Sequence, residues 1–324
     1  MRTLLKSAAL TSAAAASLAV VLALTGCSST ETGDTAATIT LENCGRTITM
    51  AGPATAAVTV NQGATESALA IGAENQMVGT AYLDDRISPQ WADAYGKITV
   101  LSDKYPDREA LLKTRPDLVA ASYASAFDDK ALGSQGSLGD LGIASYVSPF
   151  GCDDKSKRPA PSWDAVAGET SDYGVLFGRT EQAEQVNARM RATLDRLKKT
   201  NAGAGKTVMW WDAKTDSPSV GGRDGGPQLV MDAVGATNAF RQLAGNWADT
   251  GWESVLKANP DVIVLIDADW DPADAKRKYL ESDPALRDLD AVKHASYVVV
   301  PFSESTPGAR MIDGAVRLSD ALAK

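Results

Sequence analysis

Hydrophobic residues along the chain form short continuous runs that alternate with stretches of helical periodicity. Because the runs are nearly all apolar, we expect strands that are covered on both faces. Helical patterns such as ATESALAIGA and DREALLKTRP lie between them, which indicates a β-α-β order and parallel sheets. The pattern therefore predicts an α/β fold. The predicted strands are 56–61, 77–81, 117–122, 144–150, 206–213, 261–267 and 295–302.

The longest helical pattern is TEQAEQVNARMRATLDRLKKT at 180–200. Val186, Met190, Leu194 and Leu197 recur at helical spacing and form an apolar stripe. A helix of this length is roughly 30 Å long, enough to reach from one lobe to another. The chain is also too long for one small domain. We therefore expect an N-terminal α/β lobe at 47–165, a helical connection at 166–204 and a C-terminal α/β lobe at 205–324.

One sequence motif of eleven residues occurs twice in the chain. Residues 109–119 read EALLKTRPDLV, and residues 253–263 read ESVLKANPDVI. Each copy predicts a helix that begins near its glutamate, ends before Pro-Asp and leads into a strand. A glutamate in the first turn interacts favourably with the helix dipole. Two similar α-β units are therefore one explanation of the repeat.

The first residues have the pattern of a bacterial lipoprotein signal. Two basic residues precede an uncharged apolar run, and Leu24-Thr25-Gly26-Cys27 fits a lipobox. The Ser/Thr/Gly-rich stretch that follows is typical of a flexible tether. We predict a signal peptide at 1–26, a lipidated Cys27 with a tether at 27–46, and anchorage at the extracytoplasmic face of the cell membrane. An ordinary export signal with a chance cysteine is the alternative.

Charge and cysteine usage fit an exported protein. The chain has 41 acidic and 32 basic residues, and the acidic excess argues against a nucleic-acid partner. With Cys27 lipidated, Cys44 and Cys152 remain as an even pair in an oxidising compartment. We predict a disulfide between them, with two separate buried thiols as the alternative.

The sequence contains no segment that fully matches the motif of a nucleophile elbow, a phosphate-binding loop or a calcium-binding loop. His294 is the single histidine, and no Gly-x-Ser-x-Gly elbow occurs. TNAGAGKT at 200–207 has Thr200 where a phosphate-binding loop needs glycine, and it follows a helix instead of a strand. DADWDPAD at 267–274 lacks the glycine and closing glutamate of a calcium loop. We expect no enzyme, no cofactor and no metal held by protein ligands.

Aromatic residues follow several predicted strands. In α/β sheets, ligands bind outside the carboxyl ends of the strands, and aromatic rings there form an apolar cradle. Trp210 and Trp211 are adjacent, so within a strand their side chains must point to opposite faces. The other aromatic residues at or near strand ends, or just before the second repeat, are Tyr82, Tyr123, Trp247 and Trp270.

Together these segments resemble a family: the solute-binding lipoproteins of ABC importers for ferric siderophores, haem and cobalamin. The resemblance covers about 47–322. It rests on VTVNQGATESALAIGAENQMVGT at 58–80, the two repeats, the 180–200 helix and VVVPFSESTPGAR at 298–310. It implies two Rossmann-like α/β lobes with parallel sheets, joined by a single long rigid helix, with a ligand cleft between the lobes.

The resemblance also implies roles for individual residues. Glu109 and Glu253 match the two glutamates, one on each lobe, that dock onto arginines of a two-fold symmetric permease. Glu66 matches a signature position that has no docking role. The cleft positions that the resemblance implies are Tyr82, Trp211, Trp247 and Arg310.

We add Tyr123 and Trp270 to the cleft because they follow strands. An arginine in the cleft suits an anionic ligand, and a surface salt bridge is the alternative role for Arg310. We expect a monomeric binding protein that captures a ferric-siderophore-type complex and delivers it to an ABC permease dimer with its ATPase. Cobalamin, haem or an anionic coenzyme precursor are alternative ligands. A surface-anchored enzyme on a related two-lobed scaffold and a purely structural lipoprotein are alternative functions.

Overall fold

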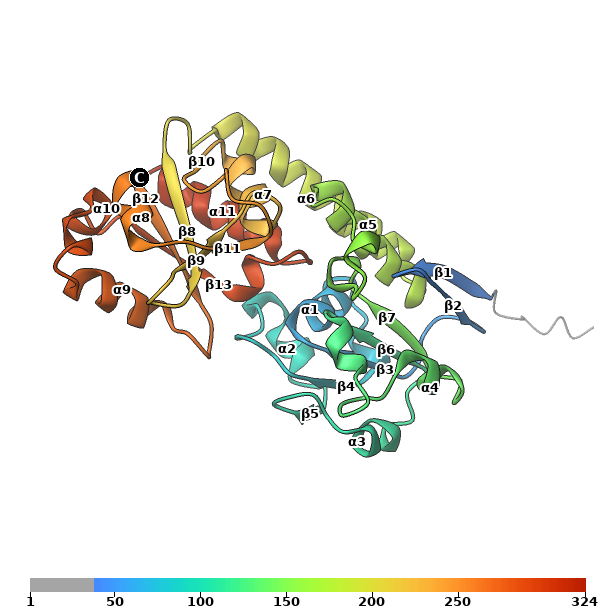
Figure 1. The fold of residues 1–324 in the computed structure, drawn as a ribbon. Helices are drawn as coiled ribbons and strands as arrows, with labels where there is room; N and C mark the ends of the chain where they lie inside the picture. Colours follow the sequence, from blue (N-terminus) through green and yellow to red (C-terminus); the bar gives the residue numbers. More distant parts are fainter. Residues whose placement is uncertain (1–37) are drawn as a thin grey trace, which may run out of the picture. The chain divides into compact units, whose positions relative to one another are not determined.

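Two β-sheets organise the part of the chain that the computed structural model describes, residues 38–324 (Figure 1). All strand pairs of the first sheet are parallel, in the order β5-β4-β3-β6-β7. This agrees with the α/β prediction. The first sheet consists of β3 (Ala57–Val60), β4 (Met77–Ala81), β5 (Val100–Ser102), β6 (Leu118–Ala121) and β7 (Ala144–Val147).

The second sheet is mixed, whereas the sequence predicted parallel strands. Its order is β11-β9-β8-β12-β13, with β10 also pairing with β8. β9 and β11 are antiparallel to their neighbours. The reason is the short loop 214–218 between β8 and β9, because a parallel crossover needs a dozen or more residues. The strands are β8 (Thr207–Ala213), β9 (Ser219–Gly221), β10 (Thr237–Asn238), β11 (Trp247–Asp249), β12 (Val262–Asp267) and β13 (Tyr297–Pro301).

Eleven α-helices accompany these sheets in the described residues. We call the first sheet with α1–α4 the N-terminal lobe, and the second sheet with α7–α11 the C-terminal lobe. Helices α5 and α6 connect them. The helices are α1 (Gln62–Ala70), α2 (Ala92–Tyr95), α3 (Arg108–Lys113), α4 (Gln135–Gly139), α5 (Trp163–Leu176), α6 (Thr180–Thr200), α7 (Gly226–Val234), α8 (Trp252–Ala258), α9 (Ala273–Ser282), α10 (Asp290–Lys293) and α11 (Met311–Leu322).

An antiparallel hairpin precedes the first sheet. Strands β1 (Ile39–Asn43) and β2 (Arg46–Met50) pair over their whole length. The Asn43 side chain bonds both backbone groups of Val147, at the end of β7. The predicted tether, 27–46, therefore extends too far, because 39–46 belong to this hairpin. Cys44 in its turn forms a disulfide with Cys152, with Cα atoms 5.4 Å apart.

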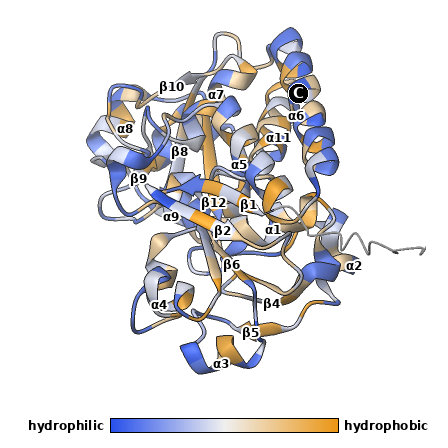
Figure 2. Cartoon of the chain, turned by 90° about the vertical axis from the view of Figure 1, so that its right-hand side faces the viewer, coloured by the Kyte–Doolittle hydropathy of each residue, from blue (hydrophilic) through white to orange (hydrophobic). Residues whose placement is uncertain are grey.

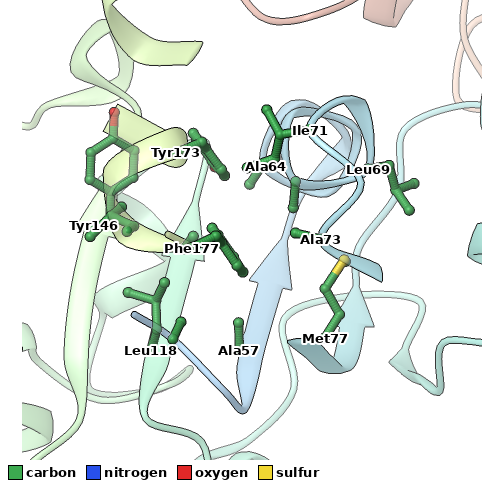
Figure 3. Packing of buried hydrophobic residues seen from close by; sticks show 14 of the residues in the cluster. Ala57, Ala64, Leu69, Ile71, Ala73, Met77, Leu118, Tyr146, Tyr173 and Phe177 are labelled. Atoms are coloured by element: carbon green, nitrogen blue, oxygen red, sulfur yellow. The ribbon is translucent and has the colours of Figure 1, made fainter. Parts of the chain in front are cut away.

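Each sheet has an apolar cluster on both faces. Along β3, Ala57 packs in one cluster, and its neighbour Val58 packs in the other. Along β8, Trp210 and Trp211 likewise enter opposite clusters, and both are fully buried. This confirms that the two indoles face away from each other. Figure 3 shows one cluster of the N-terminal lobe, where β-strand residues pack against α1 and the end of α5.

Helix α5 contributes to the cores of both lobes. Near its start, Val166 and Ala167 pack in the cluster of the C-terminal lobe. Near its end, Tyr173 packs in the cluster of the N-terminal lobe, as does Phe177, which follows it. Helix α6 begins after a short turn and runs antiparallel along α5, with hydrophilic and hydrophobic positions interleaved along it (Figures 1 and 2). The lobes are therefore joined by a helix pair that is packed into both.

The repeated motif, residues 109–119 and 253–263, adopts the same local structure in each lobe. The residue before each proline, Arg115 and Asn259, has a left-handed backbone conformation just after its helix. Each Pro-Asp carboxylate then accepts backbone hydrogen bonds at the start of the central strand beside it. Asp117 accepts from the backbone N–H groups of Thr55 and Ala56, before β3. Asp261 accepts from the Thr207 N–H at the start of β8.

Candidate functional site

A cavity of about 120 Å³ lies between the two lobes. Strand ends and helix starts of both lobes form its wall. In the N-terminal lobe it reaches the residues that follow β3, β4, β6 and β7. In the C-terminal lobe it reaches β11, the start of α7 and the segment after β13. It therefore lies at the carboxyl ends of the parallel strands, where the sheet arrangement favours ligand binding.

Four aromatic side chains line this cavity, two from each lobe. Tyr123 follows β6 and Phe150 follows β7, whereas Trp247 begins β11 and Phe302 follows β13. Tyr123 and Trp247 were predicted as cleft residues, and the structure brings them together here. Trp270 lies outside the cavity wall, 53% exposed, with its ring centroid 5.7 Å from that of Phe302.

Phe150 and Phe302 were missed by sequence reasoning, although the chain carries a signal for them. The strand β7 is followed by Ser-Pro-Phe, and β13 ends in Val-Pro and is followed by Phe302. The Pro-Phe dipeptide is thus a second sequence motif that both lobes share. In each lobe it places one phenyl ring against the cavity.

Trp211 and Tyr82 do not line the cavity. Trp211 is fully buried in the C-terminal lobe, edge-on to Trp252 at 5.0 Å between ring centroids. The reason is that β8 continues to Ala213, so the strand ends beyond this indole. Tyr82 packs against Tyr105 at 4.8 Å, with the Lys104 Nζ also 4.8 Å from its ring centre.

Arg310 lies between the lobes, where both of its terminal nitrogens face protein carboxylates and its buried Nε has no partner among the described residues. It is 5% exposed. Its Nη1 donates to Glu66 Oε1 at 3.0 Å and lies 3.5 Å from Asp85 Oδ1, and its Nη2 donates to Glu304 Oε1 at 3.1 Å. Glu66 and Asp85 belong to the N-terminal lobe, so the arginine joins both lobes. In this conformation its charge is not free for an anionic ligand.

We call Glu66, Asp85, Ser303, Glu304 and Arg310 the inter-lobe latch. Ser303 donates to Asp85 Oδ2 through its backbone N–H at 2.9 Å and through its hydroxyl at 2.8 Å. Burial raises the pKa of Glu66 to about 7, although Arg310 opposes the shift. The latch thus contains a carboxyl that titrates near neutral pH.

Asp84 is the carboxylate in the cavity wall. Burial raises its pKa to about 6, with a further contribution from the negative charge of Asp85. The backbone of Gln62 and the ammonium of Lys104 act in the opposite direction. The aspartate pair follows β4 after Tyr82 and Leu83, so the strand-end reasoning applied to aromatic residues would also have identified Asp84.

A second inter-lobe cavity of about 550 Å³ shares none of these lining residues. Its wall has no aromatic ring and includes the charged residues Asp85, Arg86, Asp267, Asp269, Arg310 and Arg317. The aromatic cavity is therefore the better candidate for a ligand with a large apolar surface.

The two repeated glutamates lie on exposed helix starts. Glu109 is in the first turn of α3 and pairs with Lys113 at 2.9 Å, with 79% of its side chain exposed. Glu253 is in the first turn of α8 and is also exposed. Both side chains are thus accessible to a partner. Cys27 lies outside the described residues.

Residues 38–324 contain neither a metal-binding cluster nor a helix that could span a membrane. No group of three or more His, Cys, Asp or Glu side chains in this range is placed to hold a metal ion. No helix in the same range has both the length and the apolar character needed to cross a membrane.

The comparisons with known proteins agree with the two-lobed α/β fold described above. The family model described as periplasmic binding protein matches residues 58–303. A periplasmic binding protein from Veillonella parvula superposes with a TM-score of 0.75 at 25% identity, over 88% of this chain and 97% of that one. No curated protein sequence matches this chain.

Two further solved structures share the fold at lower identity. One, from the ABC-type Fe³⁺-hydroxamate transport system of Saccharomonospora viridis, has a TM-score of 0.73 at 22% identity, over 88% of this chain and 99% of that one. A periplasmic haem-binding protein of Vibrio cholerae has a TM-score of 0.67 at 16% identity, over 83% and 99%. The two-lobed α/β prediction is thereby confirmed.

Proposed function

This chain belongs to the periplasmic binding protein family, and on that premise we propose that it is the extracytoplasmic substrate-binding protein of an ABC importer. Its cargo in this proposal is a ferric-siderophore-type complex, captured between the lobes and delivered to the permease. The Saccharomonospora viridis structure, named for Fe³⁺-hydroxamate transport, supports this cargo class. The role is one of binding and delivery, without catalysis.

The observation that carries the proposal is the aromatic cavity between the lobes. Its four rings come from both lobes, so a ligand held there contacts both. Broad rings at strand ends suit the apolar surface of an organic chelate better than they suit a bare ion. Binding of the metal inside a chelate also needs no metal ligands from the protein.

The size of the cavity indicates how loading occurs. At about 120 Å³ it is smaller than the roughly 300–1,000 Å³ of pockets for drug-sized ligands. We therefore expect the lobes to move apart to admit a chelate. The ion pairs and hydrogen bonds of the inter-lobe latch join the two lobes and therefore oppose this movement apart.

Delivery in this proposal uses the exposed glutamates at the starts of α3 and α8. A two-fold symmetric permease offers the same surface twice, so a binding protein placed across its axis needs a similar contact from each lobe. Glu109 and Glu253 supply such a pair of charges, at matching positions of the repeat. Lipid on Cys27 would hold the monomeric protein at the membrane that carries the permease.

The function is tested by ligand titration. A ferric trihydroxamate should quench tryptophan fluorescence and release heat in calorimetry, and a ferric catecholate, haem and cobalamin serve as comparison ligands. Trp247→Ala should weaken binding about 10-fold or more, as truncation of a buried aromatic anchor does. Trp252→Phe, a change outside the cavity in the same lobe, should bind as the wild type does. A cargo other than the ferric chelates, or unchanged affinity of Trp247→Ala, would contradict the proposal.

A further inference from the structure

The wall of the aromatic cavity contains a carboxylate but no cationic side chain. Asp84 is its carboxylate, and no lysine, arginine or histidine lines the cavity. Arg310, the cation that the sequence placed in the cleft, is neutralised within the latch. The ammonium of Lys104 lies over the ring of Tyr82, which is outside the wall.

A residue of the same wall also carries a buried acceptor without a partner. Gln62 is 2% exposed and lines the cavity. Its Nε2 donates to Glu66 Oε1 at 3.0 Å, and this bond fixes the orientation of the amide. Its Oε1 is buried and has no hydrogen-bond partner among the described residues. Because buried acceptors are normally satisfied, a bound ligand that donates a hydrogen bond here would complete the site.

We propose that the part of the cargo that enters this cavity is a primary ammonium group. It pairs with the Asp84 carboxylate and donates to Gln62 Oε1. The rings of Tyr123 and Trp247 supply faces that attract a cation. The inference rests on the proposed function and narrows its cargo class to ferric chelates that carry a positive charge. An anionic cargo would place like charges together in a buried site.

Titration of Asp84 gives this contact a pH dependence. Its pKa of about 6 leaves the carboxylate charged at pH 7. The charged groups that face it are Asp85 on the same loop, Lys104 after β5 and Asp269 after β12, and the phenol of Tyr123 is also close. Because the raised pKa makes the carboxylate neutral below pH 6, preference for a cation should decline as the pH falls through this value.

The experiment compares two forms of one chelate. A linear ferric trihydroxamate with a free amino terminus is titrated beside the same chelate after N-acetylation, by calorimetry at pH 7.5. The amino form should bind about 10-fold or more tightly, as expected for a buried charge-assisted hydrogen bond. Asp84→Asn keeps the shape and should abolish the preference. Asp129→Asn, an exposed change in the same lobe, should retain it.

The outcomes separate this inference from the proposed function. Equal affinities of the two forms for the wild type, or a preference that survives in Asp84→Asn, would overturn the ammonium site and leave the binding function standing. If neither form binds while circular dichroism shows folded protein, the proposed function fails and the inference with it. A preference that is as large at pH 5 as at pH 7.5 would also exclude Asp84 as the partner.

Discussion

Glu66 provides a quantitative test of the inter-lobe latch. It is 1% exposed, accepts hydrogen bonds from Gln62 Nε2 and the Ser88 N–H, and pairs with Arg310. Glu66→Gln keeps the shape and removes the charge. We predict that the stability of this variant depends less on pH than that of the wild type.

The magnitude follows from the pKa of Glu66. Burial raises it from the usual 4.5 to about 7 in the folded protein. The folded state therefore binds this proton more tightly than the unfolded state. The resulting stabilisation is fully present below pH 4.5 and is lost as the pH rises through 7. Between pH 5 and pH 8 this one group should change the free energy of unfolding by about 2.5 kcal/mol.

Urea unfolding at pH 5 and pH 8 measures this difference. Glu169 and Asp84, which also have raised pKa values, are present in both proteins, so the difference reports on Glu66 together with Asp85, whose charge raises the pKa of Glu66. Glu184→Gln, an exposed change on α6, is the matched control and should keep the wild-type pH dependence. If Glu66→Gln retains the full pH dependence, Glu66 does not titrate near neutrality and the electrostatic description of the latch is wrong.

Three further predictions concern the disulfide, the docking residues and the anchor. The double change Cys44→Ser and Cys152→Ser should lower the free energy of unfolding by about 4 kcal/mol, because the disulfide closes a loop of 108 residues. Urea titration measures this loss, and an unchanged unfolding midpoint would exclude it. Changing Glu109 and Glu253 together to Ala should leave ligand affinity intact but abolish stimulation of the importer's ATPase in liposomes, and normal stimulation would refute the docking role. Cys27→Ser should move the protein from the membrane fraction to the soluble fraction without loss of ligand binding, and retention after a salt wash would contradict lipid anchorage.

The sequence predicted the parallel strands well because their signal is local. Every strand of the first sheet except β5 was identified, as were β8, β12 and β13. Each is a continuous apolar run bounded by turn residues. The short strands β9, β10 and β11 were missed, since two or three residues carry no readable periodicity. The hairpin at 39–50 was missed because its first strand follows directly on a Ser/Thr-rich segment.

The site was harder to predict because its geometry depends on pairing between lobes. Tyr123 could be placed because it follows a strand, and Trp247 because it matches a cleft position of the family that the sequence resembles. Trp211 could not, because the strand continues past it. Arg310 fits the cleft by resemblance, but its partners Glu66 and Asp85 are more than two hundred residues away in sequence. No local pattern reveals that such a charge is already neutralised.

The packing of α5 into both cores makes the connection between the lobes behave as a stiff lever. A free linker would let the lobes tumble independently, and the cavity wall would then have to reassemble at each encounter with cargo. Helix α6, which packs along α5, has 21 residues and is roughly 30 Å long. Over this length, a tilt of about 6° at one end displaces the other end by about 3 Å. In the proposed loading, a small tilt of the helix pair would be enough to widen the cavity mouth, while the packing of α5 into both cores would keep the rings of the two lobes in one relative arrangement.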